Sequence, residues 1–99
     1  MEWVTLVKRE NVRKAEEILR KDFDLAAKQD IAIRDAKPLE INKDGSFFLI
    51  NGTDDGVKRC KELIKDFVEK VDEKDLIKAK EKVKEEQEKA AEAFGGILG

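Results

Sequence analysis

The sequence has 99 residues, which is enough for one domain and too few for two. Apolar residues make up 40% and charged residues 44%, and the interspersed charges leave a net charge of −2, so we expect a folded domain without a strong field toward nucleic acid. There is no His or Tyr and Cys60 is the only cysteine, which excludes the commonest general acid–base group, the commonest metal ligand and an internal disulfide. We therefore expect a protein that is not an enzyme and uses no cofactor or metal.

The sequence also predicts where the protein resides. It has no apolar run of bilayer length, and the residues from Met1 to Val4 lack the charged and apolar regions of a signal peptide. A single cysteine suits a reducing compartment, and many Lys and Glu residues with few Gln or Cys are typical of thermophile proteins. We expect a soluble cytoplasmic protein without a membrane partner, from a thermophilic source.

The first elements alternate between strand and helix. Residues 3–8 are β-branched and apolar and predict a strand, after which Asn11 is a suitable N-cap for a helix with apolar positions up to Phe23. The alternation at Ile31 and Ile33 predicts a second strand.

A hairpin is the strongest local prediction. Residues 39–42 continue the apolar alternation after Pro38, Asp44-Gly45 is the pair typical of a two-residue turn, and residues 46–51 form the returning strand. This register places one set of side chains toward the helices: Leu39, Ile41, Phe48 and Ile50. It places the others on the opposite face: Glu40, Asn42, Phe47 and Leu49.

Two helices complete the chain. Thr53, Asp54 or Asp55 can cap a helix whose apolar stripe runs to Val71, and a highly charged helix follows to Phe94, where Gly95 and Gly96 would stop it. The order β-α-β-β-β-α-α predicts an α+β fold, a small two-layer sandwich with an antiparallel sheet of three or four strands and helices on one face. We divide it into a core domain, 1–71, and a C-terminal charged helix with a short apolar tail, 72–99.

The C-terminal helix has a thin apolar stripe. Leu76, Val83, Ala90 and Ile97 are spaced seven residues apart, with opposite charges at i,i+4 around them. One interpretation is a solvated helix that packs lightly on its own domain. The other is pairing or helix exchange between two chains, which the apolar residues after Gly95-Gly96 favour.

Two further features have structural interpretations. The run from Gly52 to Gly56 joins a strand to a helix and lacks the Gly-Lys-Ser/Thr ending of a phosphate loop, so we interpret it as a turn and cap. Cys60 lies on the apolar stripe of its helix, which predicts a buried, unreactive side chain.

The residues from Asp30 to Phe67, with Ile31-Ala32-Ile33, the strand ending Asn51-Gly52 and the helix containing Glu62-Leu63-Ile64, resemble the second half of a KH RNA-binding domain. The resemblance implies a helix packed on a three-stranded sheet. That family holds nucleic acid with a GXXG loop before this hairpin, whereas no glycine precedes Gly45 here, so a KH-like fold would be degenerate and no RNA-contact residue is implied.

Our leading hypothesis is a non-catalytic protein-interaction module that forms a homodimer. Its candidate contact residues are apolar side chains that one short chain has difficulty covering: Trp3, Phe47, Leu49, Leu76, Val83, Phe94, Ile97 and Leu98. The alternative is an RNA-binding module in which Trp3 and Phe47 stack on bases near Lys8, Arg9, Arg13 and Lys14. An enzyme built on Asp54, Asp55 and Lys58 comes third.

Overall fold

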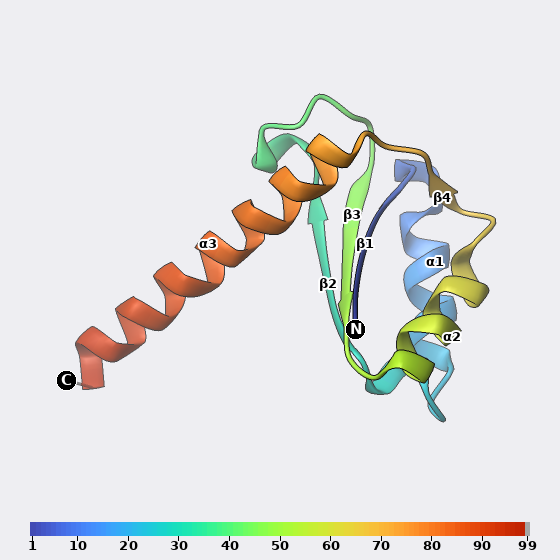
Figure 1. The fold of residues 1–99 in the computed structure, drawn as a ribbon, viewed down its shortest axis with the longest axis horizontal. Coiled ribbons are helices and arrows are strands. Elements are labelled where there is room, and N and C mark those ends of the chain that lie inside the picture. Colours follow the sequence, from blue (N-terminus) through green and yellow to red (C-terminus); the bar gives the residue numbers. More distant parts are fainter. Residues whose placement is uncertain (99) are drawn as a thin grey trace.

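The computed structural model describes the backbone of residues 1–98 and the side chains of residues 1–89. The described chain contains, in order, β1 (Glu2–Val7), α1 (Arg9–Lys21), the 3-10 turn η1 (Ala26–Lys28), β2 (Asp30–Asp35), the 3-10 turn η2 (Lys37–Leu39), β3 (Ser46–Asn51), α2 (Asp54–Ile64), β4 (Val68–Glu69) and α3 (Glu73–Leu98). The predicted α+β class with a small antiparallel sheet is confirmed (Figure 1).

The sheet has the strand order β2-β3-β1-β4, and every neighbouring pair is antiparallel. Consequently β1 and β2 run parallel with β3 between them, and β3 and β4 run parallel with β1 between them. Each parallel pair is connected by one helix, α1 or α2. This β-α-β-β-α-β arrangement is the ferredoxin-like, split βαβ topology, to which α3 is added.

The two faces of the sheet carry separate cores. On one face α1 and α2 pack on the strands and bury what we call the α1/α2 core: Val7, Ala15, Leu19, Ala26, Phe48, Ile50, Val57, Cys60 and Ile64. On the opposite face η2 and the start of α3 bury what we call the α3 core: Leu6, Ala36, Leu39, Ile41, Phe47, Ala79 and Val83. Figure 1 shows α3 on the side of the sheet away from α1 and α2.

The predicted hairpin between residues 39–42 and 46–51 is wrong. Pro38 lies inside η2, and Glu40 adopts a left-handed conformation with φ of 61°, so the chain turns away from the sheet. β3 pairs instead with β2, which places Ile33 opposite Phe48. Phe48 and Ile50 do face α1 and α2 as expected, but Leu39 and Ile41 pack in the α3 core with Phe47.

Two boundaries of the first half also differ from expectation. α1 begins at Arg9 with Lys8 at the N-cap, not at Asn11, and it ends at Lys21. Phe23 lies beyond the helix and is 75% exposed, so it does not belong to the apolar stripe. The loop after α1 is instead organised by Asp22, whose carboxylate accepts a hydrogen bond from the Ala26 amide at 3.0 Å.

The second half contains a strand that the sequence did not indicate. α2 ends at Ile64, and Val68–Glu69 then pairs with Leu6 and Val7 of β1 as the edge strand β4. Val71 consequently packs against the α3 core and not along α2. α3 also runs through Gly95 and Gly96 to Leu98, so these glycines do not stop the helix.

Candidate interaction groove

An open groove lies between α3 and the sheet, and we call it the α3 groove. Its volume is about 340 Å³, and it is lined by residues of β1, β2, β3 and α3: Glu2, Asp30, Ala32, Leu49, Asn51, Lys80, Val83, Lys84 and Gln87. It is the place where the sheet face opposite α1 and α2 is left uncovered by α3.

The course of α3 across the sheet creates this groove. Ala79 and Val83 are buried against the strands, and two ion pairs mark the direction of the helix. Lys80 Nζ lies 3.2 Å from a carboxylate oxygen of Glu2 in β1, and Arg34 Nε in β2 lies 3.1 Å from a carboxylate oxygen of Glu86. The helix therefore crosses from β1 to the edge strand β2.

Only one flank of α3 is filled. On that flank Lys78 Nζ donates to the Glu40 carbonyl at 2.8 Å, and Lys82 pairs with the Glu40 carboxylate at 3.2 Å, so η2 is tied to the helix. The other flank borders the half of the sheet that contains Asp30 and Asn51, where no described element of this chain packs. α3 thus divides the face into a filled half and an open half.

The open half combines an apolar floor with a charged rim. Ala32 and Leu49 are half-buried on the floor, beside the buried Val83. Acidic side chains border the strand side of the groove and basic side chains border the helix side. The acidic residues are Glu2 and Asp30, and the basic residues are Lys80 and Lys84. Such a groove suits a mostly apolar segment that carries charges of both signs.

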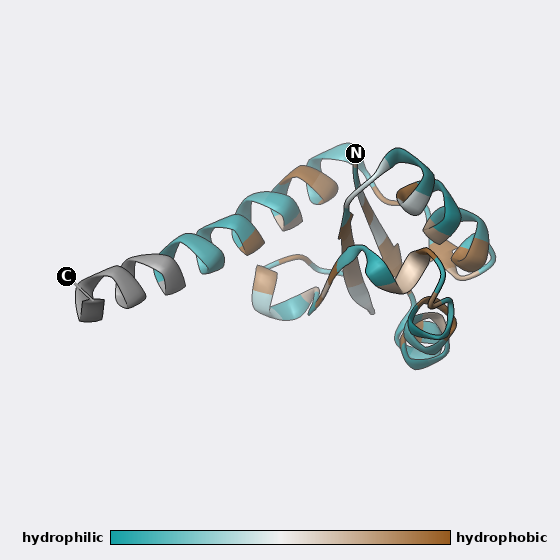
Figure 2. Ribbon diagram, turned by 90° about the horizontal axis from the view of Figure 1, so that it is seen from below, coloured by the Kyte–Doolittle hydropathy of each residue, from teal (hydrophilic) through white to brown (hydrophobic). Residues whose placement is uncertain are grey.

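Beyond Val83, α3 leaves the sheet. Residues 84–89 are exposed without exception, and six consecutive residues cover every side of an α-helix. Figure 1 shows the helix projecting away from the strands, and in Figure 2 the last turns of α3 that carry a hydropathy colour are mainly hydrophilic. Apart from the ion pair of Glu86 with Arg34, this part of α3 therefore buries no side chain against its own domain.

The structure separates the residues predicted to form one contact surface. Trp3 is half-buried on the opposite face from the groove, next to the α1/α2 core, with Lys61 Nζ 5.6 Å from the centre of its ring. Phe47 is fully buried, so it cannot stack on a base while α3 is in place. Phe47 belongs to the α3 core, and Leu76 packs against that core. Leu49 and Val83 line the groove. The side chains of Phe94, Ile97 and Leu98 lie outside the described residues.

Sequence reasoning missed the remaining lining residues. Asp30, Ala32 and Asn51 are ordinary strand residues, and Lys80 and Lys84 resemble the rest of the charged helix. The only indication was the alternation of β2, which puts Asp30, Ala32 and Arg34 on the face opposite Ile31 and Ile33. The sequence alone did not show that this face of β2 borders the groove, because that depends on the pairing of β2 with β3.

The turn from Gly52 to Gly56 is structural, as predicted. The Thr53 hydroxyl accepts a hydrogen bond from the Gly56 amide at 3.1 Å and caps α2. Gln29 fills the space above the turn: its Oε1 accepts from the Thr53 amide at 3.0 Å and its Nε2 donates to the Leu25 carbonyl at 2.9 Å. A Cβ at Gly52 or Gly56 would overlap the end of the Gln29 side chain, so a larger residue at either position would displace this amide from its hydrogen bonds.

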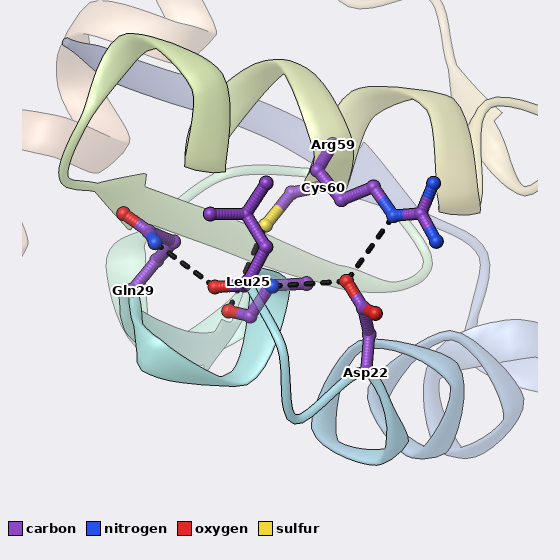
Figure 3. Close-up of polar contacts among 6 residues, drawn as sticks. Asp22, Leu25, Gln29, Arg59 and Cys60 are labelled. Carbon is purple, nitrogen blue, oxygen red and sulfur yellow. Dashed lines mark hydrogen bonds and ion pairs between the residues drawn. The ribbon is translucent and has the colours of Figure 1, made fainter.

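Cys60 and Asp22 belong to the same structural cluster (Figure 3). Cys60 is fully buried with its Sγ 4.0 Å from the Ala26 carbonyl, and burial raises the pKa of the thiol, to which the nearby Asp22 charge adds. The Ala26 amide, and then Arg59 at 3.2 Å, lower the pKa of Asp22 against the opposing effect of desolvation. The predicted buried role of Cys60 is confirmed, and a protonated thiol is a poor nucleophile.

A comparison of the chain with protein-family models, curated proteins and solved structures finds no match. None of the helices in the described residues is both long and apolar enough to span a bilayer.

Proposed function

We propose that the protein is a non-catalytic interaction module that self-associates, with the projecting part of α3 from one copy lying in the α3 groove of another. The exposed run of residues 84–89 is the observation that carries this proposal. The part of α3 after Val83 runs to Leu98. An isolated helix as short as this part is only marginally stable in water, because most helical stability in proteins comes from packing an apolar face. A second copy would supply that packing.

The sequence of the projecting part supports the same partner. Ala90, Phe94 and Ile97 follow Val83 at intervals of seven, eleven and fourteen residues, which return to the same side of an α-helix. The apolar stripe that packs α3 on its own sheet thus continues along the part that has left the sheet. Repetition at seven residues is typical of helices that pair.

The groove matches this segment in character. Its floor contains Ala32 and Leu49, and its rims carry both acidic and basic side chains, whereas the segment combines its apolar stripe with charges of both signs over residues 84–92. In a dimer with exchanged helices, the projecting part of α3 from each copy would lie in the α3 groove of the other copy.

Substitution of Phe94 tests the proposal. Sedimentation or light scattering over a range of concentrations should show a dimer for the natural chain. Phe94→Ser should raise the dissociation constant of the dimer about 100-fold, since two buried rings are lost at roughly 1.5 kcal/mol each. Glu92→Ser, on the opposite side of the helix, is the matched control and should leave the constant within about threefold.

A natural chain that stays monomeric at millimolar concentration would overturn the proposal. A monomer that binds single-stranded RNA, with affinity that falls steeply as salt is raised, would favour the nucleic-acid alternative instead.

A further inference from the structure

The outer edge of β2 has a defined pattern of backbone groups. The Ala36 amide donates to the Gly45 carbonyl directly opposite it, at 3.0 Å, in the register that continues from β2 and β3. Because hydrogen-bonded and non-bonded pairs alternate in an antiparallel ladder, Arg34 and Ala32 also bond to β3. The N–H and C=O groups of Ile31, Ile33 and Asp35 therefore point out of the sheet.

The hydrogen bonds between β3 and β1 agree with this alternation of bonded and non-bonded pairs. The Gly52 amide donates to the Met1 carbonyl at 3.0 Å, so the even-numbered residues of β3 bond toward β1 and the odd-numbered ones toward β2. β2 is the edge strand of the sheet, six residues long. Its edge carries one block: Arg34 Nη1 donates to the Ile33 carbonyl at 2.9 Å. An open edge of this length favours the addition of another strand.

We propose that β2 pairs antiparallel with β2 of a second copy about a two-fold axis at Ala32. The inference rests on the proposed self-association and names its central contact. In this register Ile31 lies opposite Ile33 of the second copy, and both residues point their backbone groups at each other. The Ile33 carbonyl becomes free for this pairing when Arg34, which now donates to it, turns to the second copy. Asp30 lies opposite Arg34 of the second copy, and Ala32 lies opposite Ala32 of the second copy. The opposed side chains are therefore either both apolar or of opposite charge.

Charge and apolarity select this register from the alternatives. An axis at Ile33 would place Ile31 opposite Asp35 and Ala32 opposite Arg34, and an axis at Arg34 would place two guanidinium groups together. The axis at Ala32 gives two Asp–Arg pairs on one face, and directly opposed charges of opposite sign stabilise neighbouring strands. On the other face it gives two Ile–Ile pairs. Ile31 and Ile33 are half-buried against the α1/α2 core, so two cores would become continuous.

The same axis brings the projecting helix to the groove. A two-fold rotation at Ala32 puts Asp30 of the second copy beside Arg34, where α3 passes through its contact at Glu86. The projecting part of α3 then points toward the open half of the second copy's sheet, the half that contains its α3 groove. Phe94 is eight residues past Glu86, about 12 Å along the helix, and β3 of the second copy would lie about 10 Å beyond β2. Phe94 would thus reach the level of the strand that contains Leu49.

A charge exchange tests the register. Asp30→Arg alone and Arg34→Asp alone should each weaken the dimer at least about tenfold, because each places like charges opposite one another twice. An equimolar mixture of the two single variants should associate, because every cross-strand pair is then complementary. The double variant should also associate more tightly than either single variant, although it cannot restore the contact between position 34 and Glu86 within one chain.

Asp24→Arg and Arg13→Asp, which make the same charge changes at exposed sites away from β2, are the controls and should leave association unchanged. If the natural chain dimerises and Phe94→Ser dissociates it, while the charge variants have no effect or the mixture does not associate, β2 pairing is overturned and the proposed function stands. If the natural chain is monomeric, both are overturned.

Discussion

The two faces of the sheet bury neighbouring residues of one strand in different ways. Phe48 lies in the α1/α2 core, which two complete helices close, whereas Phe47 lies in the α3 core, which the first turns of α3 and the short η2 turn close. Both rings are fully buried. The comparison indicates that the α1/α2 core is closed by the ferredoxin-like unit itself, whereas the α3 core depends on an added helix whose outer residues 84–89 are exposed.

The largest expected effect is in the α1/α2 core. Phe48→Ala should lower the free energy of unfolding by about 3–5 kcal/mol, because removal of a buried ring leaves a cavity among side chains from two helices and two strands. Chemical denaturation followed by circular dichroism measures this value, and amide exchange should accelerate in α1, α2 and the sheet together. A loss below about 1 kcal/mol would contradict the central role of this core.

A smaller and more local effect is expected on the other face. Val83→Ala should cost about 2 kcal/mol, from two lost methyl groups and the space they leave, and should release α3 before the sheet opens. Hydrogen exchange should accelerate in α3 while the strands keep their protection. Ile77→Ala, at a half-exposed position of the same helix, is the control and should cost under about 0.5 kcal/mol. Equal acceleration in the strands would show that the two cores open together.

The smallest expected effect concerns pH. The folded-state pKa of Asp22 lies below its ordinary value, so this carboxylate contributes stability above its unfolded pKa, near 4, and that contribution is lost as the pH falls through the folded value. Asp22→Asn should lower the melting temperature slightly at neutral pH, and the difference from the natural chain should shrink in acid. Asp24→Asn, in the same loop, is the control. A difference that grows in acid would contradict this assignment.

Periodicity predicted the helices and the two-sided nature of β3 because these depend on local spacing. It failed for residues 39–42, where the alternation of Leu39 and Ile41 is genuine but is used by a 3-10 turn and a left-handed residue to reach the α3 core. β4 was missed because two paired residues leave no periodic pattern. In both places the outcome depends on a distant partner and not on neighbouring residues.

The candidate site was predictable only in part. The expectation that Phe47 and Leu49 point away from α1 and α2 was correct, and the stripe of α3 placed Leu76 and Val83 against the sheet. The open half of the face followed from the angle at which α3 crosses the strands, which depends on its ties to Glu40, Glu2 and Arg34. Such exposed charged contacts carry no distinctive sequence pattern.

The alternation of β3 does not by itself align this strand with its neighbours. In most half-buried strands a slip by one residue would turn apolar side chains to water, but here it would merely exchange Phe47 with Phe48 and Leu49 with Ile50. The alignment is instead fixed at the two ends, where the Ser46 hydroxyl donates to Asp35 at 2.7 Å and Gly52 fits beneath Gln29. Because the centre of this strand tolerates misalignment, a few polar contacts at its ends favour the register seen in the sheet over one displaced by a residue.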